Sequence, residues 1–224
     1  MSYELKYEVS KLLDSQPRLK IDENKAEYII QGVYIYTLGF NDCILQGERN
    51  IKLIVQKDFP NSIPEFYIFD YPEHIEHVYK NGNVCLATIG EMIYFLNENP
   101  SLTAFVDKFV NAFIYTLDWF KKYKVYPFGD REHGYKGLFD YYLNDLKLTK
   151  EQYTKMIFMI YENKYRGHLP CICGSGKKLR DCHGKYILPI IKNASYKRAF
   201  LNEASMILTA VSYTHLTLPT ILLV

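Results

Sequence analysis

Three of the five cysteines and one histidine gather in a short stretch near the end of the chain. They form two pairs, Cys171-x-Cys173 and Cys182-His183, with two glycines in the residues that separate them. Three thiolates and one imidazole are the soft and borderline ligands that tetrahedral Zn²⁺ prefers. The glycines allow the chain to double back, so that both pairs reach one ion. The pattern predicts a closed, structural zinc site with the ligands Cys171, Cys173, Cys182 and His183.

The stretch from Pro170 to Gly184 resembles the SEC-C zinc motif, Cys-x-Cys-x8-Cys-His, over its whole length. A segment this short buries too little apolar surface to fold alone, so zinc binding would supply its folding free energy. Four cations surround the ligands: Lys177, Lys178, Arg180 and Lys185. They either offset the negative charge of a three-thiolate site or contact an acidic protein or a nucleic acid.

A second thiol, Cys85, lies in the string Asn81-Gly82-Asn83-Val84-Cys85-Leu86. Residues 70–100 around it read as an irregular segment, too long for a passive connection and therefore a functional candidate. A thiolate is a strong nucleophile, and a thiol on a loop is open to two reaction partners. The alternative is a buried, inert cysteine that packs as a small apolar side chain. Cys43 has no motif around it and reads as structural.

The elements around Cys85 indicate an α+β fold. The spacing of apolar residues predicts a helix within residues 3–15. Runs of residues with high β-propensity predict strands at 28–30, 33–37, 51–55 and 65–69. Glycines at 32, 39 and 47 suggest turns between strands of an antiparallel meander. Ser101 is expected to cap a helix over 102–120. Further helices are expected near 138–146, 150–164 and 190–210.

This order of elements, with Cys85 after the meander, resembles the ubiquitin-conjugating fold over about residues 1–120. The local text is also similar to that family, in Ile51-x-Leu53-x-Val55, Phe59-Pro60, Ile63-Pro64 and Asn81-Gly82-x-Val84-Cys85-Leu86. The resemblance implies a cysteine acyltransferase that holds an acyl group as a thioester on Cys85 and passes it to or from a protein partner.

The groups that would assist Cys85 depart from the family pattern. Eukaryotic-type members carry a His-Pro-Asn string about ten residues before the cysteine, whereas this chain has His74-Ile75-Glu76-His77. Candidates to stabilise an oxyanion are His77, Asn81 and Asn83. His133 is a further candidate to face the site. Each histidine also has a purely structural interpretation.

A second resemblance concerns three strings further along the chain. Trp119-Phe120, Tyr126-Pro127-Phe128-Gly129 and His133-Gly134-x-x-Gly137-x-x-Asp140-Tyr141-Tyr142 are similar to bacterial conjugating domains. Those domains accompany cyclic-oligonucleotide antiphage signalling systems (CBASS). The resemblance implies that the partner is a cGAS-like nucleotidyltransferase, or a ubiquitin-like donor.

Charge divides the chain into two parts. Residues 1–165 carry 19 basic and 23 acidic side chains, whereas residues 166–198 carry eight basic side chains and one acidic one. This asymmetry suggests two units. Together with the resemblances and the expected elements, it leads us to expect a conjugating-like domain at 1–148, a helical linker at 149–166, the SEC-C motif at 167–186 and a C-terminal helix at 187–210. Residues 211–224 include Val211-Ser212-Tyr213-Thr214-His215-Leu216-Thr217-Leu218-Pro219-Thr220, which resembles a translated sequencing adapter and is set aside.

Composition limits the class of protein. The chain is 48% hydrophobic, which favours a folded core over disorder. Neither a signal peptide nor a membrane span is evident, and an odd cysteine count with clustered thiols favours a reducing cytoplasm. Two rival functions stay open. One is a catalytically inactive scaffold with the same fold, and the other is a zinc-dependent adaptor that binds a partner or nucleic acid.

Overall fold

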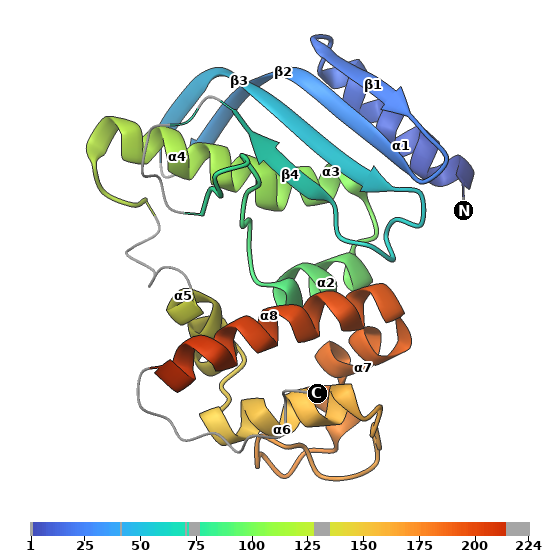
Figure 1. The fold of residues 1–224 in the computed structure, drawn as a ribbon. Helices are drawn as coiled ribbons and strands as arrows, with labels where there is room; N and C mark the ends of the chain where they lie inside the picture. Colours follow the sequence, from blue (N-terminus) through green and yellow to red (C-terminus); the bar gives the residue numbers. More distant parts are fainter. Residues whose placement is uncertain (1, 41, 70, 72–76, 128–134, 214–224) are drawn as a thin grey trace. The chain divides into compact units, whose positions relative to one another are not determined.

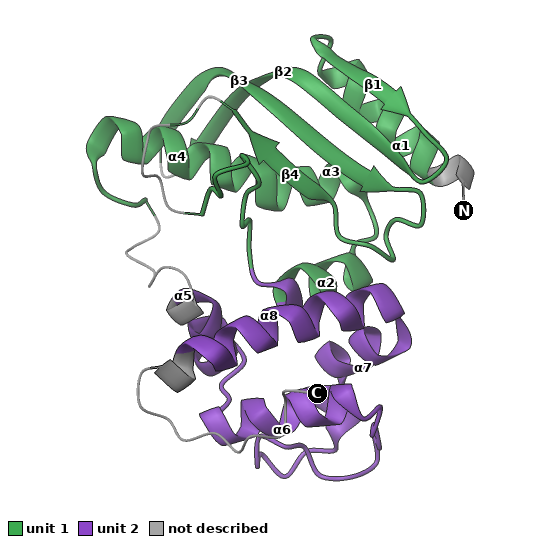
Figure 2. Cartoon of the chain, in the orientation of Figure 1, with its two compact units in different colours: residues 1–87, 91–131 green, residues 88–90, 132–224 purple. Residues whose placement is uncertain are grey.

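The computed structural model describes residues 2–40, 42–69, 71, 77–127 and 135–213. The chain divides into two compact units, residues 1–87 with 91–131 and residues 88–90 with 132–224 (Figure 2). Residues 132–148, which the sequence places in the first domain, belong to the second compact unit. The functional boundary at residue 148 stays a prediction.

The first unit is built on a four-stranded antiparallel sheet in the order β1-β2-β3-β4 (Figure 1). Helix α1 (Ser2–Ser15) precedes the sheet, as the sequence predicts. The strands are β1 (Leu19–Glu23), β2 (Glu27–Phe40), β3 (Cys43–Gln56) and β4 (Glu65–Ile68). The expected mixed fold with an antiparallel meander is therefore present.

The strand boundaries differ from the expected ones because two glycines mark close approaches rather than turns. Gly32 and Gly47 lie inside the long strands β2 and β3, so the predicted turns there are wrong. A Cβ at Gly32 would lie 2.5 Å from the Arg18 carbonyl oxygen, and one at Gly47 would lie 2.6 Å from the Tyr36 hydroxyl. Strand β1 has one buried side chain, Leu19, and so lacks the apolar alternation that identifies a strand.

Four helical elements follow the meander: α2 (Ile89–Glu98), α3 (Leu102–Phe105), the π-helical turn η1 (Val106–Val110) and α4 (Asn111–Tyr123). The hydroxyl of Ser101 accepts a hydrogen bond from the Ala104 amide, which confirms the predicted cap. Helix α2 corrects the expectation that 70–100 is irregular throughout. Its Met92, Ile93 and Leu96 are buried at helical spacing, between a glycine and a proline that suggested a loop.

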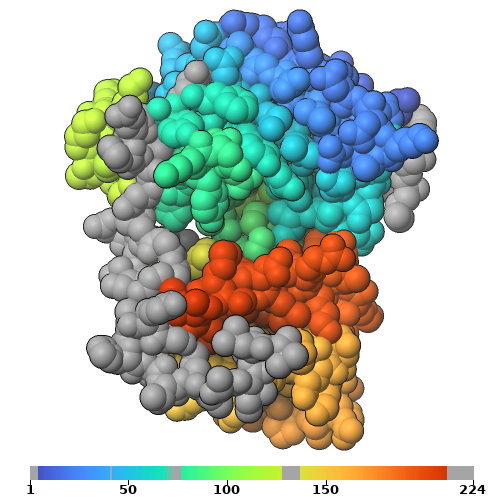
Figure 3. All heavy atoms as spheres, in the orientation of Figure 1, coloured from blue at the N-terminus to red at the C-terminus, as the bar shows by residue number. Residues whose placement is uncertain are grey.

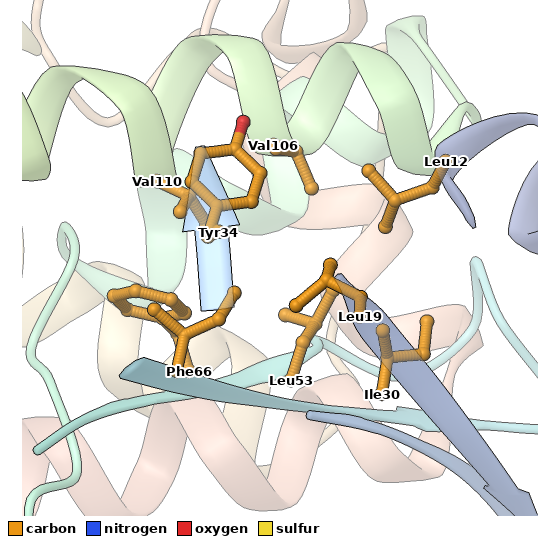
Figure 4. A pocket seen from close by; sticks show the side chains of 9 residues that line it. Leu12, Leu19, Ile30, Tyr34, Leu53, Phe66, Val106 and Val110 are labelled. Carbon is orange, nitrogen blue, oxygen red and sulfur yellow. The ribbon is translucent and has the colours of Figure 1, made fainter. Parts of the chain in front are cut away.

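The core of the first unit lies between one face of the sheet and helices α1, α3 and α4. A narrow gap remains there, lined by apolar side chains and Tyr34 (Figure 4): Leu12, Leu19, Ile30, Ile51, Leu53, Phe66, Val106 and Val110. It leaves about 10 Å³ for the centre of a water-sized sphere. This is near the limit for one water molecule, so the gap is a packing defect rather than a ligand site.

The second unit is helical. Its elements are α5 (Tyr135–Asp140), the π-helical turn η2 (Tyr141–Asp145), α6 (Lys150–Tyr161), the 3₁₀ turn η3 (Leu179–Asp181), α7 (Gly184–Lys192) and α8 (Ala194–Tyr213). Thr149 and Gln152 form a capping box that starts α6. The expected final helix is two helices, because the Asn193 side chain accepts bonds from Ser195 and Tyr196 amides and starts α8 afresh.

Candidate functional site

A tight backbone hairpin brings the two halves of the cysteine-rich segment together. Pro170 forms an antiparallel bridge with Lys178, and the Cys171 amide donates to the Lys177 carbonyl at 2.8 Å. The Leu179 amide donates to the Leu169 carbonyl, also at 2.8 Å. This hairpin reverses the direction of the chain, so that the second pair of ligands lies near the first pair.

The four predicted ligands converge. The Sγ atoms of Cys171, Cys173 and Cys182 and a ring nitrogen of His183 all lie within 4.8 Å of one another. His183 Nδ1 is 3.2 Å from Cys171 Sγ and 3.3 Å from Cys182 Sγ. Such spacing suits four ligands around one tetrahedral ion.

The hydrogen bond made by the other ring nitrogen of His183, Nε2, determines the tautomer of the imidazole. His183 Nε2 lies 2.7 Å from the carbonyl oxygen of Leu146, which can only accept a hydrogen bond. Nε2 therefore carries the proton, and Nδ1 presents its lone pair to the cluster. This is the supporting contact that metal-binding histidines make with a backbone carbonyl, and it ties the cluster to the end of η2.

The thiols of the cluster have different acidities. Burial raises the pKa of the Cys171 thiol to about 11. At Cys173 burial also disfavours the thiolate, but hydrogen bonding to Ser175 outweighs it and lowers the pKa to about 6. A divalent cation would favour the thiolate form at all three positions, because metal ligation requires deprotonated sulfur.

The donor set fits Zn²⁺ and leaves no ligand position for a substrate. Cys171 and His183 are buried, and Cys173 and Cys182 are half-buried. Three sulfurs and one imidazole complete a tetrahedral shell without a water molecule, which is the arrangement of structural zinc sites. A metal here would cross-link the hairpin to α7 and not take part in a reaction.

The cations around the cluster are all exposed: Lys177, Lys178, Arg180 and Lys185. Arg180 lies 3.7 Å from Asp181, and the Lys185 ammonium lies 5.2 Å from the centre of the Tyr186 ring. Both interactions are weak at a solvated surface. The predicted contact with an acidic partner or nucleic acid stays a prediction.

Cys85 lies at the end of a segment that is hydrogen-bonded to the edge strand β4. The Val84 amide donates to the Phe66 carbonyl, and the Ile68 amide donates to the Gly82 carbonyl, both at 2.9 Å. Gly82 has a φ of +84°, and a Cβ there would lie 2.8 Å from the Ile68 carbonyl oxygen. The sheet therefore fixes the backbone before the thiol, and the Cys85 side chain itself is half-buried.

Three of the candidate residues that could assist Cys85 (His77, Asn81 and Asn83) lie near it along the chain, and each makes different contacts. His77 is exposed, has a φ of +66°, and its carbonyl accepts a hydrogen bond from the Cys85 amide at 2.8 Å. The Asn81 side chain accepts a bond from the Asn83 amide at 3.0 Å and so supports its own turn. His133 lies outside the described residues. The role of each as an oxyanion donor stays a prediction.

Glu203, which the sequence did not single out, forms a buried polar group with Tyr142, which the sequence singled out only as part of a family-like string. Glu203 of α8 is 3% exposed, and Oε2 accepts a hydrogen bond from the Tyr142 hydroxyl at 2.7 Å. Burial raises the pKa of the Glu203 carboxyl to about 7. One signal was available, because Glu203 interrupts the apolar stripe Phe200, Ala204 and Ile207 of α8.

Comparison with known proteins bears on the cysteine cluster. The family model for the SEC-C motif matches residues 169–185. The chain contains a SEC-C motif. No curated protein and no solved structure matches the chain. Within the ranges that the structure describes, no helix combines the length and hydropathy needed to cross a membrane.

Proposed function

We propose that the protein is a ubiquitin-conjugating-type acyl carrier that forms a thioester on Cys85, with the SEC-C motif as a structural zinc module. The observation that carries the proposal is the placement of Cys85. Its thiol follows a turn pinned to β4, after a helix and an antiparallel meander, and it is half-buried rather than sealed in the core. A rigid backbone beside an accessible thiol is what an acyl carrier needs.

The proposed chemistry is two successive acyl exchanges. The Cys85 thiolate attacks the carbonyl carbon of a donor thioester, the new C–S bond forms, and the donor thiolate leaves. A neutral amine then attacks the carbonyl carbon of the Cys85 thioester, the C–N bond forms and the C–S bond breaks, the Cys85 thiolate leaves, and the proton lost by the nitrogen passes to solvent. Both steps pass through a tetrahedral oxyanion, for which His77, Asn81 and Asn83 are the nearest candidate donors in the sequence.

The partner follows only from resemblance. The strings at 119–120, 126–129 and 133–142 are similar to conjugating domains of CBASS systems, which supports a cGAS-like nucleotidyltransferase as the protein partner. A ubiquitin-like donor is the alternative for the first exchange. A gene for a cGAS-like enzyme beside the gene for this chain would support the first choice.

Intact-mass measurement with a charged ubiquitin-like donor tests the proposal. We expect an adduct that a thiol reductant removes, and that is lost in Cys85→Ala. Cys85→Ser should hold the same acyl group as an oxyester that resists the reductant. Cys43→Ala is the matched control and should keep the adduct.

An inactive scaffold is the second candidate, because the chain lacks the family's His-Pro-Asn string. No adduct with any donor tested, while a partner is still bound, would favour the scaffold. An adduct that persists in Cys85→Ala would place the acyl group on another residue and contradict the proposal. Salt-dependent binding to DNA or RNA that survives Cys85→Ala and is lost on chelation would instead favour a zinc-dependent adaptor.

A further inference from the structure

The first turn of α2 is held by a carboxylate from a distant part of the chain. Glu203 Oε1 accepts a hydrogen bond from the Ile89 amide at 2.8 Å. Glu203 lies on the packed side of α8, whereas the other side of this helix is seen at the surface in Figure 3. Because the first amides of a helix lack partners within the helix, the carboxylate supplies an acceptor that the local sequence does not.

Tyr142 completes this arrangement. Its hydroxyl donates to Glu203 Oε2 at 2.7 Å and accepts from the Gly90 amide at 3.3 Å. Gly90 suits the contact, because a Cβ there would lie 2.7 Å from the Tyr142 hydroxyl oxygen. The hydroxyl thus bridges the carboxylate and the second amide of the helix, in a site from which water is excluded.

The residues held in this way follow Cys85 after only Leu86, Ala87 and Thr88. On the other side, the Cys85 amide is bonded to the His77 carbonyl. We infer that Tyr142 and Glu203 form a latch on the first turn of α2 and act as positioning residues for the Cys85 thiol. The inference rests on the proposed function for its purpose, but the latch and its effect on the thiol are measurable without any acyl donor.

Hydrogen bonds also connect the latch to the SEC-C motif. The Leu148 amide donates to the Tyr142 carbonyl at 3.2 Å, and His183 Nε2 donates to the Leu146 carbonyl. The segment that carries Tyr142 is therefore held at its end by a ligand of the candidate zinc site. A structural metal would in this way help to keep the latch closed.

Tyr142→Phe tests the latch, with Tyr153→Phe as the matched control. Tyr153 is equally buried and stacks 4.5 Å from Tyr142 between ring centres, and its hydroxyl has no hydrogen-bond partner among the described residues. In Tyr142→Phe, hydrogen exchange at the Gly90 amide should rise about ten-fold, because this buried donor loses its acceptor, whereas the Ile89 amide keeps Glu203 Oε1 and should change less. Alkylation of Cys85 by iodoacetamide should become several-fold faster.

Three readouts separate the latch from general loss of structure. Amides in the middle of α6, in the same unit, should exchange at the wild-type rate, and the zinc content should not change. Tyr153→Phe should alter neither the exchange nor the alkylation by more than about two-fold. Glu203→Gln, which keeps an acceptor for the Ile89 amide, should give a smaller increase than Tyr142→Phe at Gly90.

Unchanged exchange at Gly90 in Tyr142→Phe, or equal effects in the two tyrosine variants, would overturn the latch. Faster exchange with unchanged or slower alkylation would overturn the positioning of Cys85. Loss of the thioester proposal would appear separately, as no donor adduct in a protein whose latch responds as expected.

Discussion

The two sulfur-bearing regions of this protein differ in how their chemistry is assembled. In the SEC-C motif, four ligand atoms lie within 4.8 Å of one another and come from one short segment. At Cys85, the thiol follows a backbone segment that is hydrogen-bonded to β4, and the Cys85 amide donates to the His77 carbonyl. The candidate metal ligands all come from one short segment of the chain. The position of the nucleophile depends instead on a strand that is separate from its own loop.

The two regions therefore differ in how far the local sequence predicts their structure. In the motif, the spacing of the two ligand pairs predicts a four-ligand zinc site, because the chain can turn back and bring both pairs to one ion. The backbone before Cys85 is instead held by hydrogen bonds to β4. Three predictions test this difference between the two regions.

The largest effect is expected from loss of a metal ligand. Cys171→Ser should abolish stoichiometric zinc binding and unfold the motif, because structural zinc contributes roughly 10 kcal/mol or more of folding free energy in comparable segments. Zinc content by mass spectrometry and the melting temperature report the two losses. Cys43→Ser should retain the metal. Full zinc content in Cys171→Ser would contradict the four-ligand site.

A smaller effect is expected from Glu203 and depends on pH. Its carboxyl has a pKa of about 7 in the folded protein, against 4.5 for the ordinary group, because burial disfavours the charge. Its stabilisation is therefore complete below pH 4.5 and is lost as pH rises through 7. The wild type should lose roughly 3 kcal/mol across this window relative to Glu203→Gln.

Urea unfolding of both proteins between pH 4.5 and 8, with zinc present, measures this difference. Tyr142 and Tyr153 face the carboxyl and stay protonated in that range, since burial raises the pKa of both hydroxyls. A difference between the two proteins that does not change with pH would show that Glu203 does not titrate in this window.

The smallest effects compare two glycines, one in each region. Gly82→Ala places a Cβ 2.8 Å from the Ile68 carbonyl oxygen at a φ of +84°, and should cost about 2–3 kcal/mol. Gly176→Ala, at a φ of +75° with open space around it, should cost about 1 kcal/mol. Denaturant unfolding measures both. Equal costs would show that the turn before Cys85 is not tightly bound to β4.

Much of the fold could be predicted because its signals are local. Ser101 precedes an apolar stripe and caps α3, and Thr149 precedes a glutamine at the capping-box distance and starts α6. Glycines were harder to interpret. Gly32 and Gly47 read as turns but serve close contacts with Arg18 and Tyr36, and those partners are distant in the sequence.

The candidate metal ligands, the meander and the position of Cys85 after it could all be predicted from the sequence. These features depend on residue types, on spacing and on hydrophobic period, all of which are written along the chain. Only the tertiary structure decided that Leu146 orients His183, that β4 holds the turn before Cys85, and that Tyr142 and Glu203 hold the turn after it. Each is a hydrogen bond between segments far apart in the sequence. The spacing of apolar residues along the chain does not reveal such a bond.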